Sequence, residues 1–405
     1  TARKGQPRRS ATGDQHLCIG HLVPLQSALV RTLSVSIIAA IITNDWHQSM
    51  AVSQSAEIAD MQAVTDAADW RAEDLSASDD WIYRLTDQDV SELDAGIASV
   101  EAAGIDIAAI EERDFPLPAL HGKLRDIENR ILNGRGVALI KGVPVERYSH
   151  RQAAIAYWGI GLRLGVPVSQ NAKGHVLGHV KNLTGGDFND STHRGYHTSA
   201  DLPWHADSCD VVALLCLQTS RSGGESYFVS SVAIHNEMIA RRPDLAAEMV
   251  KPWFRDRRGE IPEGKDPWWS LPVFNYVDGK LVTSWQGKYI RGAQRFEELP
   301  RFTAKQTEAL EMITSLAEEL SFSMTFEPGD IQVLHNHVVL HRRSDYEDGP
   351  EPGQKRHLLR LWLATPNGRA LPQGLIDRYG VIGPSGRPAG IYVPGTKPVL
   401  PLDAE

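Results

Sequence analysis

The tetrapeptide Trp204–His205–Ala206–Asp207 places an imidazole and a carboxylate two residues apart. On an extended strand, side chains at this spacing point to the same side. Together with one more histidine they make the 2-His-1-carboxylate arrangement, which holds Fe(II) on one face and leaves its other positions open. The motif is short enough to occur by chance, so a purely structural role for His205 and Asp207 is the alternative reading.

The missing histidine could come from the segment 327–341, where a Pro-Gly turn leads into an apolar run that ends in three histidines. These are His335, His337 and His341. On one regular strand all three would share a face, so their spacing does not choose the ligand. Each of them could equally be a hydrogen-bonded structural histidine.

Two arginines, Arg356 and Arg360, lie in the largely apolar run 355–363, which has the composition of a strand. A buried guanidinium is costly unless it is paired with an anion, and its planar fork suits a carboxylate. The run therefore predicts an anion site, unless both arginines face solvent.

Taken together, these segments resemble the taurine/2,4-D dioxygenase family of Fe(II)/2-oxoglutarate-dependent oxygenases. The His-x-Asp motif, Gly-Gly-Glu-Ser at 223–226, the histidine segment and Arg-His-Leu-Leu-Arg-Leu-Trp-Leu at 356–363 occur in the family's order, over residues 110–370. The resemblance implies a double-stranded β-helix (jelly-roll) core. It also implies that the iron ligands are His205, Asp207 and His341.

The same resemblance implies the contacts of the cosubstrate. Arg356 is expected to pair with the distal carboxylate of 2-oxoglutarate, with the Ser226 hydroxyl beside it. Arg360 is expected near the C1 end of 2-oxoglutarate or near an anionic group of the substrate. The implied reaction uses O2 to oxidise a C–H bond of a small molecule, with succinate and CO2 as co-products.

One departure from the family pattern concerns the arginine register. The acidic, Pro-rich loop 345–352 is longer than in the taurine enzyme, so Arg342 and Arg343 stay as alternatives to Arg356. The carboxylate of Asp207 fills the position that related halogenases leave free for halide, which favours hydroxylation, or a desaturation or cleavage of the same kind, over chlorination.

Two other classes of protein could carry these residues. A cupin-type isomerase or a zinc hydrolase would keep the histidines but would have no use for Arg356. A binding protein with a decayed site would not need the complete set. The substrate is specified only weakly: Arg360 hints at an anion, Trp204 is expected to line the site, and the aromatic-rich stretch 253–289 could line an apolar pocket or simply belong to the core.

The surrounding elements predict a mainly β protein with flanking helices, an α+β fold. Helices are expected after the N-caps Thr86, Ser149 and Thr303, over residues 117–132, and from Ser230 towards Met249. Short apolar runs bounded by Gly and Pro turns predict strands. They cover residues 137–140, 211–217, 226–229, 281–285, 331–334 and 357–364.

The composition of the 405 residues is that of an ordinary globular enzyme, and the net charge of −9 argues against nucleic acid as a partner. Three cysteines without a CxxC pair favour a reducing compartment, so we expect a cytoplasmic protein. Residues 1–49 differ in composition from the rest. Their apolar run 22–42 is interrupted by Gln26 and Arg31, which argues against a membrane span.

We interpret residues 1–49 as a disordered extension, either translated from upstream of Met50 or serving as a targeting peptide, with the first interpretation favoured. Residues 50–405 are expected to form one oxygenase domain with a helical N-terminal part and a Gly/Pro-rich tail. Its expected partner is a small-molecule substrate, with no membrane partner, and the sequence allows a homo-oligomer.

Overall fold

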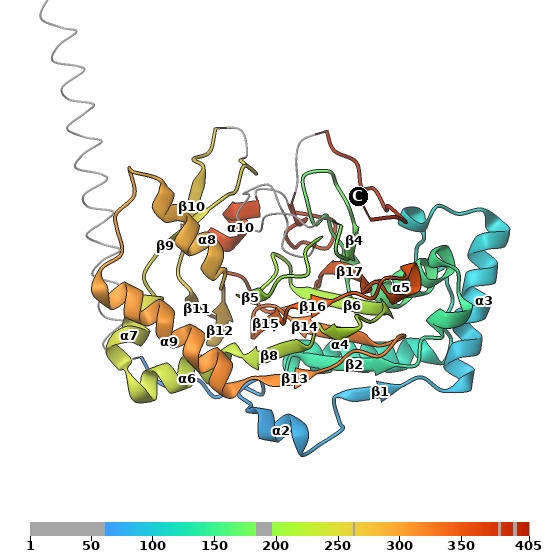
Figure 1. Cartoon of the computed structure of the whole chain (residues 1–405), viewed down its shortest axis with the longest axis horizontal. Helices are drawn as coiled ribbons and strands as arrows, with labels where there is room; N and C mark the ends of the chain where they lie inside the picture. Colours follow the sequence, from blue (N-terminus) through green and yellow to red (C-terminus); the bar gives the residue numbers. More distant parts are fainter. Residues whose placement is uncertain (1–60, 184–196, 262–263, 380–381, 392–394, 405) are drawn as a thin grey trace, which may run out of the picture. The chain divides into compact units, whose positions relative to one another are not determined.

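The computed structural model describes residues 61–183, 197–261, 264–379, 382–391 and 395–404. The extension predicted over residues 1–49 lies outside these residues. Two β-sheets form the centre of the described part, and helices pack on their outer sides (Figure 1).

The larger sheet has seven strands. Its strand order is β1-β2-β14-β6-β17-β3, and β4 also pairs with β17. All eight residues of β17 are buried, which explains why this strand is readable in the sequence as a largely apolar run. The strands are β1 (Ile82–Arg84), β2 (Val137–Lys141), β3 (Val166–Pro167), β4 (Leu177–Val180), β6 (Val211–Gln218), β14 (Ile331–His335) and β17 (His357–Ala364).

The smaller sheet has four strands in the order β13-β8-β15-β5. Its neighbouring strands are antiparallel, and β15 pairs with both β8 and β5. Its register places His341 of β15 opposite His205 of β5, and Arg343 of β15 opposite Ser226 of β8. The strands are β5 (Leu202–His205), β8 (Ser226–Ser230), β13 (Phe322–Met324) and β15 (Val339–Arg343).

Two long helices, α4 (Leu120–Asn133) and α5 (His150–Leu164), cover the outer side of the larger sheet, and a third, α3 (Asp87–Ala103), packs on α5. Thr86 and Ser149 are the N-caps of α3 and α5, as predicted, and in both cases the structure adds a capping box. The helix predicted from residue 117 begins three residues later, at Leu120. Apolar side chains of these helices pack in one cluster with those of β2, β6, β14 and β17.

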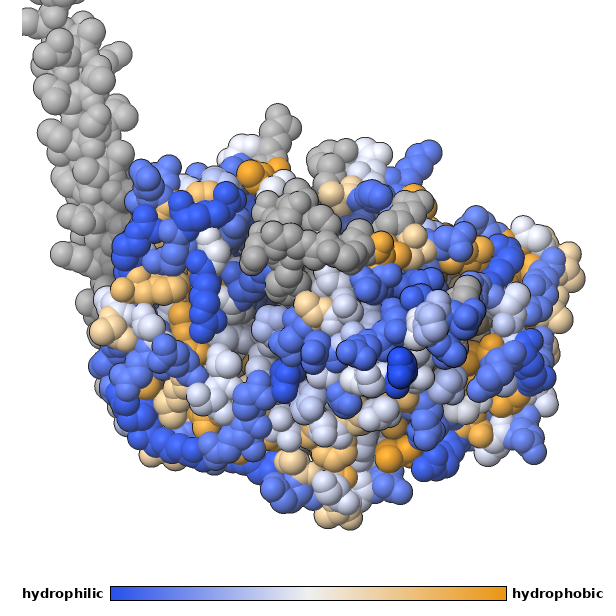
Figure 2. All heavy atoms as spheres, viewed as in Figure 1, coloured by the Kyte–Doolittle hydropathy of each residue, from blue (hydrophilic) through white to orange (hydrophobic). Residues whose placement is uncertain are grey.

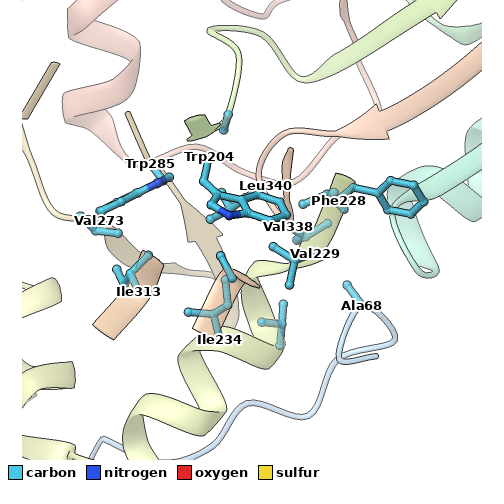
Figure 3. Packing of buried hydrophobic residues seen from close by; sticks show 14 of the residues in the cluster. Ala68, Trp204, Phe228, Val229, Ile234, Val273, Trp285, Ile313, Val338 and Leu340 are labelled. Atoms are coloured by element: carbon cyan, nitrogen blue, oxygen red, sulfur yellow. The ribbon is translucent and has the colours of Figure 1, made fainter. Parts of the chain in front are cut away.

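A second group of helices covers the smaller sheet: α6 (Ser231–Arg241), α7 (Pro243–Met249) and α9 (Ala304–Leu320). Their apolar faces pack against the strands around Trp204, Phe228 and Leu340 (Figure 3). The prediction of one helix from Ser230 to Met249 is wrong, because the chain leaves helical geometry at Arg242 and Pro243 starts a new helix.

The histidine segment also differs from the prediction. His335 ends β14, His337 lies in a turn and His341 belongs to β15, so the three histidines do not share one strand face. The turn, residues 336–338, contains neither glycine nor proline, and this hid the change of direction in the sequence.

The remaining described elements are short. Hairpins join β9 with β10 and β11 with β12, and β7 pairs with β16. They are α2 (Ala72–Ser76), α8 (Gly287–Gly292), α10 (Gln373–Tyr379), β7 (Ser222–Gly223), β9 (Trp253–Asp256), β10 (Trp268–Leu271), β11 (Phe274–Val277), β12 (Lys280–Thr283), β16 (Tyr346–Glu347) and the 3-10 turns η1 (Ile107–Ala109), η2 (Val145–Arg147), η4 (Ala293–Arg295) and η5 (Pro352–Gln354).

The visible surface is mainly hydrophilic, with apolar residues scattered between charged ones (Figure 2). Within the described part of the chain, each helix is either too short or too polar to span a bilayer.

Candidate metal centre

Three side chains with metal-binding atoms meet at the end of β5. The His205 and His341 rings lie opposite each other on neighbouring strands, with centroids 4.2 Å apart. Asp207 follows β5, and its Oδ1 lies 3.8 Å from Nε2 of His205. One donor atom from each of the three lies within 4.8 Å of the other two, close enough to hold a single ion.

Hydrogen bonds hold the donor atoms of these candidate ligands in this orientation. Nδ1 of His205 lies 2.9 Å from the carbonyl oxygen of Pro203, which requires a proton on Nδ1 and leaves the lone pair on Nε2. The indole Nε1 of Trp362 donates to Oδ2 of Asp207 at 2.9 Å, and Nη1 of Arg360 lies 3.6 Å from the same oxygen. Partners of this kind fix ligand geometry in metal sites.

The backbone between the two ligands is clamped as well. The amide of Ala206 donates to the carbonyl of Trp285, and Nε2 of Gln286 donates to the carbonyl of Ala206 at 3.3 Å. The Gln286 side chain is itself held by Nε of Arg255, which donates to its Oε1 at 3.2 Å. Arg255 is fully buried and its other described acceptors are backbone carbonyls, so it serves as an anchor for Gln286.

The electrostatics favour the protonation states that bind a metal. Burial lowers the pKa of His205, and burial together with the neighbouring His205 lowers the pKa of His341 to about 3. Burial by itself would raise the pKa of Asp207, but the charge of Arg360 and the adjacent imidazoles bring it below its ordinary value. The group is therefore two neutral imidazoles and one carboxylate, as metal ligation requires.

The other two histidines of the segment, His335 and His337, are not part of this group of candidate ligands. Nε2 of His337 lies 2.9 Å from Oδ1 of Asp210. The two oxygens of the same carboxylate also accept a bidentate pair of hydrogen bonds from Arg387. His335 is completely buried, and neither ring nitrogen has a hydrogen-bond partner. Of the three histidines, only His341 faces His205 and Asp207.

A small cavity of about 40 Å³ lies between the two sheets beside the three ligands. Arg356 enters it from the start of β17 and is 4 % exposed, and its Nη1 has no hydrogen-bond partner. Ser226 and Arg360 line the same cavity. The Ser226 hydroxyl donates to Oε1 of Gln332 at 3.0 Å, so its oxygen can still accept a bond.

A larger cavity of about 120 Å³ borders His205 and Asp207 and contains the side chains a substrate would meet. Four lysine and arginine residues line it, Arg258, Lys288, Arg360 and Arg378. Of the aromatic residues in 253–289, only Tyr289 reaches this cavity within the described chain, and the others lie elsewhere. The predicted pocket-lining residue Trp204 borders the cavity, but its ring is buried beneath α9 and donates to Glu318 at 2.7 Å.

Comparison with known proteins identifies the family. Residues 100–362 match the family described as "Taurine catabolism dioxygenase TauD, TfdA family". The chain belongs to this family.

Two relatives support the family assignment. The chain is 31% identical over 328 residues to FR-33289 synthase of Streptomyces rubellomurinus, which covers 78% of this chain and 95% of the relative. It is 30% identical over 336 residues to the taurine hydroxylase-like protein SAT17 of Stachybotrys chartarum, covering 80% of this chain and 84% of the relative.

Solved structures share the fold of this TauD, TfdA family member. Asparagine oxygenase with Fe(II), 2S,3S-3-hydroxyasparagine and succinate has a TM-score of 0.56 at 15% identity, covering 76% of this chain and 98% of that one. The non-heme iron oxygenase OrfP with Fe and alpha-ketoglutaric acid has a TM-score of 0.54 at 14% identity, covering 76% and 99%. The jelly-roll expectation is thus confirmed, and the chain is an Fe(II)/2-oxoglutarate-dependent oxygenase.

The residues of this family member fit its cofactors. Two neutral imidazoles and a carboxylate are a donor set for Fe(II) that leaves positions open. The unpartnered guanidinium nitrogen of Arg356, in the adjoining cavity, suits one end of a dicarboxylate. The structure brings all six predicted site residues together around these two features, and their individual roles stay predictions.

Sequence reasoning did not identify two further residues of the site, and it named a third, Arg343, only as an alternative to Arg356. Trp362 and Gln286 carry no motif of their own, because they act on the ligands through contacts that only the fold creates. Arg343 lines the small cavity together with Arg356. The sequence did offer a signal for Arg343, since it stayed open as an alternative in the arginine register.

Proposed function

We propose that this oxygenase hydroxylates a C–H bond of a small, anionic organic substrate, with His205, Asp207 and His341 as the iron ligands. The observation that carries the proposal is the meeting of these three side chains beside a small cavity lined by Arg356, whose buried Nη1 is unpaired. Fe(II), when bound, supplies activation of O2 coupled to the conversion of 2-oxoglutarate to succinate and CO2.

The chain's own residues position the reactants. Arg356 and Ser226 hold the distal end of 2-oxoglutarate, which orients the keto acid before chemistry begins. Arg360 lines both cavities and lies next to Asp207, so it can interact with the C1 carboxylate or with a substrate anion.

The substrate's charge follows from the lining of the larger cavity. Arg258, Lys288 and Arg378 outnumber Glu260, the only acidic lining residue besides the ligand Asp207 among the described ones. Burial, with the charge of Arg258 nearby, lowers the pKa of Lys288, as expected where cations converge. Such a lining attracts anions and raises their local concentration. Asparagine oxygenase, crystallised with hydroxyasparagine, supports a small polar substrate for a protein of this fold.

The remaining expectations are part of the same proposal. Residues 50–405 act as one domain in the cytoplasm, as a monomer or homo-oligomer. The carboxylate of Asp207 favours hydroxylation over halogenation.

The test is a screen of small organic acids, with matched neutral and cationic compounds, for substrate-dependent succinate formation in the presence of Fe(II), O2 and 2-oxoglutarate. We expect an acid to stimulate succinate formation and to gain one oxygen atom by mass spectrometry. A fully iron-loaded protein that forms no succinate, even at the slow rate without substrate, would instead favour the isomerase or hydrolase alternative.

A further inference from the structure

Four arginines line the small cavity, Arg342, Arg343, Arg356 and Arg360, and the role of Arg343 is not yet accounted for. Arg343 lies two residues after the ligand His341 on β15 and directly opposite Ser226 on β8. Its side chain lines the cavity together with Ser226 and Arg356. Arg343 therefore lies in the space that the distal end of 2-oxoglutarate is proposed to occupy.

The hydrogen bonds of Arg343 leave one arm of the guanidinium unused. Nη2 donates to the carbonyls of Thr198 and Ala200, and Nε donates to the carbonyl of Ser344 at 3.1 Å. Nη1 is buried and has no partner. All three acceptors are neutral, so nothing among these contacts compensates the charge of a side chain that is 5 % exposed. An uncompensated buried cation is costly.

Arg356 is in the same situation and lies near the same aromatic ring as Arg343. The guanidinium carbons of Arg343 and Arg356 lie 4.7 and 5.2 Å from the ring centre of Tyr346. Both arginines have an unpartnered Nη1, and both line the same cavity. Two buried cations this close repel each other, and an anion between them would remove both the repulsion and the unsatisfied donors.

The neighbouring Arg342 differs from Arg343, because two carboxylates already balance its charge. Its Nη1 lies 3.0 Å from Asp201 and its Nη2 lies 3.2 Å from Glu318. Arg343 has no such carboxylate among its hydrogen-bond partners.

We propose that Nη1 of Arg343 is a second binding group for the distal carboxylate of 2-oxoglutarate, acting together with Arg356. A carboxylate offers two oxygens with about four acceptor positions, enough for two guanidinium donors and the Ser226 hydroxyl. The proposal rests on the cavity assignment made above. The competing role for Arg343 is purely structural, the fastening of residues 198–200 through Nη2.

The test compares the binding of two keto acids to several variants of the protein. 2-Oxopentanoate keeps the keto-acid head of 2-oxoglutarate and replaces its distal carboxylate by a methyl group. Dissociation constants of both compounds are measured on the Fe(II)-loaded protein without oxygen, for wild type, Arg343→Gln, Arg343→Lys and the control Arg342→Gln. Circular dichroism checks that each variant is folded.

We expect Arg343→Gln to weaken 2-oxoglutarate binding about tenfold or more, the size of a lost charge-assisted hydrogen bond, and to leave 2-oxopentanoate binding nearly unchanged. Arg343→Lys should fall between wild type and Arg343→Gln, and Arg342→Gln should change neither constant. If Arg343 is purely structural, Arg343→Gln should weaken the binding of both compounds by the same factor, and this result would overturn the proposal. No change in either dissociation constant would overturn it as well.

Arg356→Gln separates this inference from the proposed function. Selectivity here means tighter binding of 2-oxoglutarate than of 2-oxopentanoate. If Arg356→Gln loses this selectivity and Arg343→Gln keeps it, only the role of Arg343 is wrong. If neither variant loses selectivity, the cavity is not the cosubstrate site, and both proposals are wrong.

Discussion

The indole of Trp362 donates a hydrogen bond of 2.9 Å to the carboxylate of Asp207. Trp362 belongs to β17 of the larger sheet, whereas Asp207 follows β5 of the smaller one. The orientation of one proposed ligand therefore depends on how the two sheets of the jelly roll are packed together.

Replacing Trp362 by phenylalanine should weaken iron binding. The ring is largely kept, but Asp207 loses the donor that orients it, and loss of such a partner costs about 10–100-fold in metal affinity. The measurement is an Fe(II) titration without oxygen. The matched control is Trp285→Phe, since the Trp285 indole is also buried and its Nε1 has no partner. Equal iron affinities for the two variants would contradict this role of Trp362.

Gln286 should act on both stability and iron binding, and two substitutions should separate the effects. Gln286→Met removes the bond to the Ala206 carbonyl and leaves Arg255 with one acceptor fewer, so we expect a loss of about 1–3 kcal/mol in unfolding free energy together with weaker iron binding. Gln286→Glu still accepts from Arg255 but cannot donate to Ala206. It should recover stability without recovering iron affinity, as measured by urea unfolding and Fe(II) titration. Recovery of both would show that the bond to Ala206 is unimportant.

The buried ion pair between Arg387 and Asp210 should be a major source of stability in the C-terminal part. Arg387 makes bidentate contact with Asp210, which is 3 % exposed and also bonded by His337 and the Thr365 amide. Arg387→Ala leaves this carboxylate without its main countercharge, so urea unfolding should show a loss of about 3–5 kcal/mol. The control Arg241→Ala removes exposed ion pairs and should barely change stability. A small loss for Arg387→Ala would mean that water or His337 replaces the arginine.

The histidine pair at the start of β17 should make the protein less stable in mild acid. Nε2 of His357 lies 2.8 Å from Nδ1 of His179, and burial, with His179, Lys181 and His150 nearby, lowers the pKa of His357 to about 3. Burial also lowers the pKa of His179, which the carbonyl of Pro401 and the charge of Asp403 only partly oppose.

Since the folded protein holds His357 neutral, the unfolded chain binds more protons below its ordinary pKa of about 6.5. Stability should therefore be complete above that pH and decrease as the pH falls towards 3, by an amount of the order of 2 kcal/mol at pH 5 from this residue alone. Unfolding midpoints between pH 8 and 5 check the prediction, with His357→Asn expected to have a flatter profile. Identical slopes for both proteins would contradict it.

The sequence predicts those parts of the fold in which one physical signal dominates. The capped starts of α3, α5 and α9 follow from Thr86, Ser149 and Thr303, and β6, β14 and β17 follow from largely apolar runs. β5 and β15 were not predicted because they are short and contain the polar residues of the site itself. These two strands are nevertheless the ones that bring His205 and His341 together.

The candidate site is predictable only in part for the same reason. The residue types of His205, Asp207 and Arg356 carry chemical information that can be read without a structure. The choice of His341 over His335 and His337 depends on the turn after β14, and the roles of Trp362, Gln286 and Arg343 depend on contacts between strands distant in sequence. Burial of Arg343 beside Arg356 is likewise a property of the folded chain.

The most direct test of the account is the iron content and 2-oxoglutarate binding of His341→Ala, compared with His335→Ala, after reconstitution with Fe(II) without oxygen. We predict one iron per chain and 2-oxoglutarate binding for the wild type and for His335→Ala, and the loss of both for a folded His341→Ala. If His341→Ala kept its iron and bound 2-oxoglutarate as the wild type does, the proposed metal centre would be wrong.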